Sequence, residues 1–166
     1  MMKAGVAIGS NLGDRLDHLR QARGFLRSIS DGGCLLAAPV YETEPVDCPP
    51  GTPAFFNTVV EIESSLPPQK LLEQLLQFEA SHGRPNVHGK NAPRTVDLDL
   101  LYCGEAMLNE AALTLPHPRL RQRRFVLQPL ADIRPELVLP GFDRPVRELL
   151  ASLGDAQPVR LAAKDW

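Results

Sequence analysis

The stretch PRTVDLDLLY, residues 93–102, is the part of the sequence on which the fold prediction most depends. Polar and apolar residues alternate from position 95 onward, which predicts a strand over 95–102. Side chains two residues apart on a strand share a face and lie about 6.6 Å apart, at roughly 3.3 Å per residue. Asp97 and Asp99 are therefore expected to point the same way. The apolar residues expected to enter the core from the opposite face are Val96, Leu98 and Leu100.

The segments before this strand alternate between strand and helix patterns. The expected strands are 3–8, 34–41 and 55–63, and the expected helices run over about 14–29 and from Pro67-Pro68 to Gly83. The resulting order, β-α-β-β-α-β, predicts an α+β fold: a ferredoxin-like βαββαβ core in an α/β sandwich. A short strand is expected at 113–115 and additional C-terminal helices at 123–133 and 146–153. We expect one domain over 1–166, in which the tail after Gly154 shows no informative pattern.

Composition excludes several classes of protein. The chain has 166 residues, 43% of them apolar, which fits one packed core and excludes a wholly disordered chain. A net charge of -2 argues against a general nucleic-acid or membrane-surface binder. No apolar run approaches the roughly 20 residues of a membrane helix, and Met1–Gly9 does not read as a signal peptide. Three scattered cysteines suggest neither a disulfide framework nor a zinc site. We therefore expect a cytoplasmic domain.

The paired carboxylates of Asp97 and Asp99 suggest a metal site. Two parallel carboxylates repel each other unless a cation lies near both. Mg²⁺ suits the position, because it prefers oxygen ligands and is usually held by one or two carboxylates together with substrate phosphates. The spacing alone leaves a second interpretation open, in which the two aspartates form the solvated face of an amphipathic strand.

Arginines near these aspartates favour the metal interpretation. Arg84 and Arg94 flank the polar loop before the acidic strand, and four more arginines lie between 119 and 124, just after His117. Guanidinium groups bind phosphate oxygens in a bidentate manner, so carboxylates and arginines together provide the parts of a phosphoryl-transfer site. A solvated helix start remains the favoured interpretation for Arg121 and Arg124.

Neither of the common glycine-rich phosphate-binding motifs is indicated by the sequence. The segment GSNLGD, residues 9–14, reads as a turn followed by a helix cap rather than as an anion-binding loop. No GxxxxGK[ST] motif is present, which excludes a P-loop kinase.

Several short motifs together resemble one enzyme family. They are GSNLGD (9–14), YETEPV (41–46), FN (56–57), GR (83–84), PRTVDLD (93–99) and LPHPR (115–119). Their order and approximate spacing resemble those of the 6-hydroxymethyl-7,8-dihydropterin pyrophosphokinases, over about residues 4–140. The resemblance implies transfer of pyrophosphate from ATP to the hydroxymethyl group of the reduced pterin, with release of AMP, in folate biosynthesis.

The resemblance also implies roles for individual residues. Asp97 and Asp99 would hold two Mg²⁺ ions. The residues that would contact the triphosphate or its closing loops are Arg84, Arg94, His117 and Arg123, of which Arg84 and Arg94 are counted with the aspartates as catalytic. The residues that would form the pterin pocket are Thr43, Val46, Phe55, Asn57 and Phe125. A flat heterocycle needs aromatic walls and amide groups that match its donor–acceptor edge. No side-chain base is assigned.

The sequence departs from the family pattern in the loop over 84–92, which would close over ATP. Asn91-Ala92 replaces a common Trp-Gly, Asn86 replaces a second arginine, and Pro118 stands where some members have tyrosine. These changes put loop contacts in doubt and leave open a binding paralogue with poor turnover. An RNA-binding βαββαβ module is a further alternative, disfavoured by the acidic pair. The expected partners are ATP and the reduced hydroxymethylpterin, with no nucleic acid and no membrane. The protein is expected to be a monomer.

Overall fold

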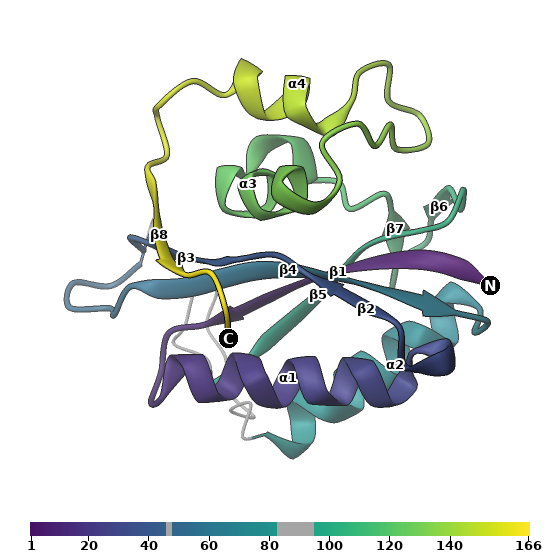
Figure 1. The fold of residues 1–166 in the computed structure, drawn as a ribbon, viewed down its shortest axis with the longest axis horizontal. Coiled ribbons are helices and arrows are strands. Elements are labelled where there is room, and N and C mark those ends of the chain that lie inside the picture. The colour runs from purple at the N-terminus through teal and green to yellow at the C-terminus, as the bar shows by residue number, and fades with distance from the viewer. Residues whose placement is uncertain (46–47, 83–94) are drawn as a thin grey trace.

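A central antiparallel sheet with helices on both faces organises the chain (Figure 1). The computed structural model describes residues 1–45, 48–82 and 95–166. The strands are β1 (Met2–Ser10), β2 (Leu35–Ala37), β3 (Val40–Thr43), β4 (Phe55–Ser64), β5 (Asp97–Cys103), β6 (Leu108–Asn109), β7 (Thr114–Leu115) and β8 (Val159–Ala163). The helices are α1 (Arg15–Ile29), α2 (Pro68–Ser81), α3 (Arg124–Ile133) and α4 (Val146–Ser152), with single turns of 3₁₀ helix at η1 (Asp31–Gly33) and η2 (Leu120–Gln122).

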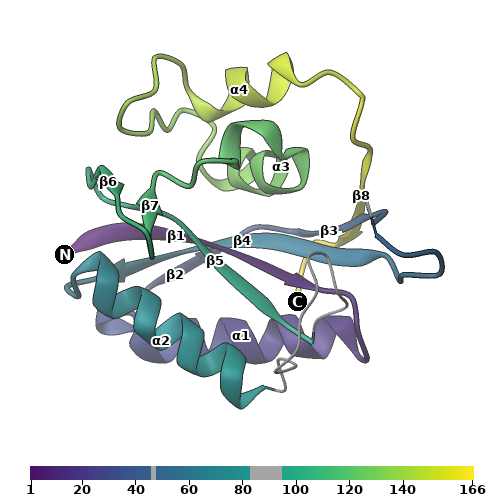
Figure 2. The ribbon, with the colours of Figure 1, turned by 180° about the vertical axis from the view of Figure 1, so that it is seen from behind.

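The strand order confirms the predicted ferredoxin-like core. Along the sheet the order is β5-β1-β4-β3-β8, with β2 also paired to β4, and every pairing is antiparallel. Helices α1 and α2 cover one face, while α3 and α4 cover the other (Figure 2). The strand predicted over 34–41 is divided into β2 and β3, because Pro39 between them has no N–H to donate to the ladder.

Local sequence signals determine where helices α1 and α2 begin. The side chain of Asp14 accepts a hydrogen bond from the backbone N–H of Asp17 at 3.1 Å, so the turn-and-cap interpretation of residues 9–14 is confirmed. Helix α2 begins at Pro68, where a proline costs no helical hydrogen bond, and its C-cap is His82.

Two hydrophobic cores lie on opposite faces of the sheet. The first, beneath α1 and α2, includes Val6, Ile8, Val60, Ile62, Leu98 and Leu100. The second, beneath α3 and α4, includes Val59, Leu101, Leu120, Leu127 and Leu130. Because β4 contributes to both, its side chains are buried along almost its whole length. In the described ranges, no helix combines the length and the hydropathy needed to cross a bilayer.

The second core also encloses a charged group. The carboxylate of Glu61 in β4 accepts a hydrogen bond from the Tyr102 hydroxyl at 2.6 Å. It also accepts from Nε and Nη2 of Arg134, just after α3, at 3.0 and 2.6 Å. Partnered in this way, a buried carboxylate can be accommodated. The network links the C-terminal end of α3 to the sheet.

The C-terminal tail is more ordered than the sequence indicated. It forms β8, which pairs with β3 at the edge of the sheet (Figure 1). The last residue, Trp166, is buried in the first core and donates its indole N–H to the carbonyl of Ala38 at 2.8 Å. The tail therefore completes the sheet edge, a role that was not predicted.

Candidate active site

Strand β5 places the two aspartates on the face that α3 covers. Leu98 and Leu100 point into the first core, so the alternation of a strand turns Asp97 and Asp99 to the opposite face. The prediction that the two carboxylates share a face is confirmed. Because β5 is the edge strand beyond β1, both groups also lie at the margin of the sheet.

Arg123 approaches this acidic face from the N-cap of α3. Its Nη1 lies 3.7 Å from Oδ2 of Asp99, an ion pair in which both side chains are partly exposed. Its guanidinium carbon lies 5.7 Å from the ring centre of Phe125. Burial lowers the pKa of Arg123 and the charge of Asp99 opposes that shift, but the group remains a cation at any ordinary pH.

His117 is held by two backbone contacts. Its N–H donates to the carbonyl of Leu101 at 2.8 Å, and its Nδ1 accepts from the backbone N–H of Arg119 at 3.1 Å. Burial, followed by the charges of Arg123 and Arg119, lowers the pKa of His117 to about 4, although Asp97 acts in the opposite direction. At neutral pH the ring is therefore uncharged. Because Nδ1 accepts a hydrogen bond, the proton of the ring is on Nε2, which can donate it to a ligand.

A cleft of about 400 Å³ runs along the outer edge of β5. Asp97, Asp99 and His117 line it together with Leu76 from α2 and Thr114 from β7. The cleft brings carboxylates, a neutral histidine and apolar side chains into one open space, which matches the mixed lining of ligand sites.

Glu79 is a lining residue that the sequence did not single out. It lies in α2, is almost fully buried, and belongs to the wall of the same cleft. A signal was present: Glu79 follows Leu71 and Leu75 at intervals of four, so it occupies the apolar stripe of its helix. A carboxylate at such a position points to a polar function or a specific partner.

A second group of predicted residues lies on the same face of the sheet, in β3 and β4. Thr43 pairs with Phe55 in the β3–β4 register, and Asn57 lies two residues further along β4. Nδ2 of Asn57 donates to Oγ1 of Thr43 at 2.8 Å, and both residues are buried. The orientation of the amide is therefore fixed by its neighbour.

Gly9 separates the acidic residues from this amide. It pairs with Asp97 on β5 and with Asn57 on β4, so the three residues form one row across three strands. A Cβ at Gly9 would lie 2.9 Å from Oδ1 of Asn57. Strands lie about 4.8 Å apart, so the outer two backbones are roughly 10 Å apart with no side chain between them on this face.

The remaining predicted residues fall into two groups. Phe125 lies in the first turn of α3 and packs partly against the second core. Val46, Arg84 and Arg94 lie outside the described residues, as do Asn86 and Asn91. Arg121 and Arg124, for which a solvated helix start was the favoured interpretation, make contacts outside the cleft. Arg121 lies over the ring of Phe142 at 4.5 Å, and Arg124 donates to the carbonyl of Gly154.

The donor set fits a hard divalent cation. Within residues 1–45, 48–82 and 95–166, no cluster of three or more His, Cys, Asp or Glu side chains is arranged to hold a metal by itself. Two neighbouring carboxylates suit Mg²⁺, which usually takes its other ligands from water and substrate phosphates.

Comparison with known proteins gives consistent matches. The sequence profile of the 7,8-dihydro-6-hydroxymethylpterin-pyrophosphokinase (HPPK) family matches residues 5–135. The 2-amino-4-hydroxy-6-hydroxymethyldihydropteridine pyrophosphokinase of Haemophilus influenzae is 32% identical over 161 residues, covering 97% of this chain and 99% of that protein. The Bacillus subtilis protein of the same name is 41% identical over 128 residues, covering 77% of this chain and 75% of its own length.

Longer proteins also match. Folic acid synthesis protein fol1 of Pneumocystis carinii is 38% identical over 135 residues, which cover 81% of this chain and 18% of that protein. A solved structure described as HPPK-DHPS in complex with substrates has a TM-score of 0.68 at 14% identity, covering 91% of this chain and 43% of that one. The chain thus spans about a fifth of the fungal relatives and under half of the solved chain.

The chain is an α+β sandwich whose cleft carries two carboxylates and a histidine. The chain belongs to the 7,8-dihydro-6-hydroxymethylpterin-pyrophosphokinase family, as the resemblance implied. Enzymes of this family are ATP-dependent diphosphotransferases of folate synthesis.

Proposed function

We propose that this chain transfers the pyrophosphate of ATP to the hydroxymethyl group of 6-hydroxymethyl-7,8-dihydropterin and releases AMP. The substrate hydroxyl oxygen forms a bond to the β-phosphorus, and the bond from that phosphorus to the oxygen bridging to the α-phosphorus breaks. AMP leaves with that oxygen, and the hydroxyl proton passes to solvent. The observation that carries the proposal is the row Asp97–Gly9–Asn57, which sets an acidic site and an amide on one face of the sheet.

Asp97 and Asp99 are the residues that would hold Mg²⁺, and two ions are part of the proposal. When bound, such ions neutralise phosphate charge and lower the pKa of the attacking hydroxyl. The contribution of the chain is to keep both carboxylates on one face at the sheet margin, where a triphosphate can reach them. The expected coordination leaves most ligand positions to water and phosphate oxygens.

Arg123 and His117 are proposed to bind the triphosphate. Arg123 offers a planar set of N–H donors beside Asp99, and this geometry suits phosphate oxygens. His117 offers its Nε2–H as a neutral donor, because its lowered pKa keeps the ring uncharged. Arg84 and Arg94 are proposed to add further contacts to the triphosphate, on the family resemblance alone.

The pterin is proposed to bind over β3 and β4. Asn57, oriented by Thr43, would hydrogen-bond the heterocycle edge. Phe55 and Phe125 would contact its faces, and Val46 would complete the pocket on the family resemblance alone. One chain supplies every residue named here, and a monomer is part of the proposal.

The test is an incubation of the chain with ATP, Mg²⁺ and the reduced hydroxymethylpterin, followed by separation of AMP from ADP. We expect AMP together with a diphosphorylated pterin. Formation of ADP would indicate a different kinase. Measurable pterin binding without any product would indicate a paralogue that retains the pocket and has lost the transfer.

A further inference from the structure

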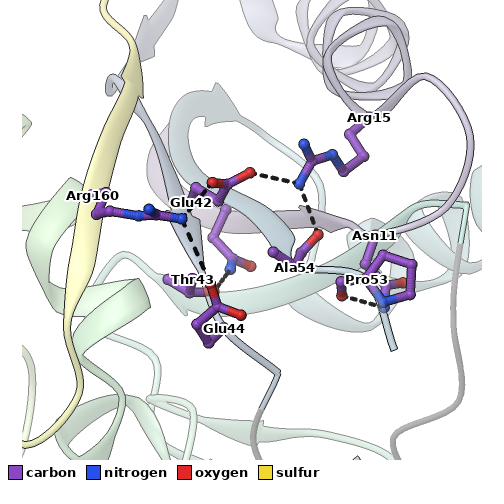
Figure 3. A network of polar contacts seen from close by, with 9 residues as sticks. Asn11, Arg15, Glu42, Thr43, Glu44, Pro53, Ala54 and Arg160 are labelled. Carbon is purple, nitrogen blue, oxygen red and sulfur yellow. Dashed lines mark hydrogen bonds and ion pairs between the residues drawn. The ribbon is translucent and has the colours of Figure 1, made fainter. Parts of the chain in front are cut away.

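Arg15, the first residue of α1, contacts the two segments that carry Thr43 and Phe55. Its Nη1 donates to Oε2 of Glu42 in β3 at 2.9 Å and to the carbonyl oxygen of Ala54, just before β4, also at 2.9 Å. Figure 3 shows this side chain reaching both acceptors from the helix. One guanidinium nitrogen therefore connects α1 to β3 and to the residue that precedes β4.

These contacts are made on the face of the sheet opposite the proposed pterin pocket. Glu42 pairs with Phe56, and the next pair along the ladder is Thr43 with Phe55. Because successive side chains alternate between faces, Glu42 and Phe56 face α1 when Thr43 and Phe55 face the pocket. The guanidinium carbon of Arg15 lies 3.8 Å from the ring centre of Phe56, which places it over this part of the sheet.

Each acceptor of Arg15 is one residue away from a proposed pocket residue. Glu42 precedes Thr43, and Ala54 precedes Phe55. The β3–β4 ladder ends at the pair Thr43–Phe55, so the two strands support each other no further along the chain. Arg15 adds an ion pair and a backbone hydrogen bond at this end of the ladder. Its side chain is only 27% exposed and that of Glu42 25%, so solvent screens the pair less than at a fully exposed site.

A second arginine shares the same carboxylate and offers an internal comparison. Nη2 of Arg160 in β8 lies 2.7 Å from Oε1 of Glu42 and 3.6 Å from Oε1 of Glu44 (Figure 3). Its side chain is 68% exposed, so its contribution is expected to be small. Both arginines neutralise Glu42, but the bond to the Ala54 carbonyl belongs to Arg15.

We propose that Arg15 is a positioning residue for the part of the pterin pocket that Thr43 and Phe55 form. It fixes the spacing of the β3 end and the β4 start from behind the sheet, and thereby the relative placement of Thr43 and Phe55, without touching substrate. This inference rests on the proposed function, because that proposal makes these two residues part of the pocket. It predicts that loss of Arg15 weakens pterin binding and leaves ATP binding unaffected. Asp97 and Asp99, with the Arg123 that pairs with Asp99, lie at the β5 margin of the sheet, away from Arg15.

The test compares Arg15→Met with Arg160→Met. We expect Arg15→Met to raise the KM for the pterin, and its dissociation constant measured by calorimetric titration, about fivefold or more. The KM for ATP and kcat are expected to stay within about twofold of the parent values. Arg160→Met should leave the KM for both substrates within about twofold of the parent values, because it removes one cation beside Glu42 and keeps the bond from Arg15 to the Ala54 carbonyl. Arg15→Lys, which keeps a cation and a donor, should recover part of the pterin affinity.

Unchanged pterin binding in a folded Arg15→Met variant, or an equal rise in the KM of both substrates, would overturn the inference. If that variant does not fold, Glu42→Gln takes its place and is expected to weaken pterin binding alone, by about twofold or more. Absence of product with the parent chain would count against the proposed function instead. The titration still tests Arg15 in that case, because it needs binding without turnover.

Discussion

Nη1 of Arg123 lies 3.7 Å from Oδ2 of Asp99, so the N-cap of α3 is joined to the edge strand β5 by an ion pair. At this separation the pair is an electrostatic contact rather than a hydrogen bond. Acceptors that approach the guanidinium more closely than Asp99 does can therefore form stronger contacts with Arg123. A phosphate next to Asp99 would provide such acceptors, and the arginine would then connect α3 to the bound nucleotide.

Replacing Arg123 by methionine should weaken ATP binding. We expect the KM for ATP to rise about tenfold, because a charge-assisted donor to phosphate is lost, with a smaller effect on the KM for the pterin. Steady-state kinetics with each substrate varied in turn provide the measurement. The control is Arg121→Met, since Arg121 packs over Phe142 outside the acidic face, and its ATP kinetics should match the parent. Similar ATP kinetics for both variants would remove Arg123 from the triphosphate site.

Replacing Asp97 by asparagine should abolish Mg²⁺-dependent release of AMP. The substitution keeps the shape of the side chain and removes one of the two charges that hold the cation, so we expect a loss of about 100-fold or more in kcat/KM. The fold should be preserved, because Asp97 is only partly buried at the margin of the sheet and asparagine keeps the shape of its side chain. Thermal unfolding of the variant checks the fold. Near-normal turnover would contradict the assignment of Asp97 as a metal ligand.

Local periodicity was enough to predict the elements around the site. The alternation from Val96 to Leu100 gave the strand and the shared face of the two aspartates, because strand geometry follows directly from a two-residue repeat. The cap at Asp14 was equally local, since its acceptor and donor are three residues apart.

Contacts between distant segments were not predictable in this way. Arg160 and Glu42 are 118 residues apart, and the segment that carries Arg160 has no alternating pattern because β8 is an edge strand exposed over most of its length. Arg15 reads in the sequence only as a polar residue at a helix start. Its role depends on the register of β3 and β4, which a single sequence does not specify.

Gly9 provides a test of the row that joins the acidic site to the amide. In Gly9→Ala the new Cβ would lie 2.9 Å from Oδ1 of Asn57, so the amide must move. We expect pterin affinity to fall about tenfold, as judged by titration, because a misoriented amide no longer matches the heterocycle edge. The matched control is Gly24→Ala, at a position in α1 where the added Cβ meets nothing within 4 Å beyond its chain neighbours and the backbone of its own helix. It should leave binding unchanged and stabilise the fold by about 0.5–1 kcal/mol. Equal pterin affinities for the two variants would contradict the proposed position of the pterin.

His117 should make the stability of the ligand-free protein depend on pH. Its pKa is lowered to about 4 in the folded state, chiefly by burial, whereas the unfolded chain titrates near the ordinary value of about 6.5. Between these values the unfolded state binds a proton that the folded state does not, so the free energy of unfolding falls as the pH is lowered from about 6.5 toward 4.

Chemical denaturation in metal-free buffer at pH 7 and pH 5 measures this contribution. Over that interval the free energy of unfolding of the parent chain should fall by about 1 kcal/mol more than that of His117→Gln. This value is smaller than the full pKa shift would give, because the ring is only partly buried. If His117→Gln and the parent lost the same free energy of unfolding between pH 7 and pH 5, the ring would titrate in the folded protein as it does in the unfolded chain. His117 would then carry a positive charge in mildly acidic solution, and its proposed role as a neutral donor to the triphosphate would be confined to higher pH.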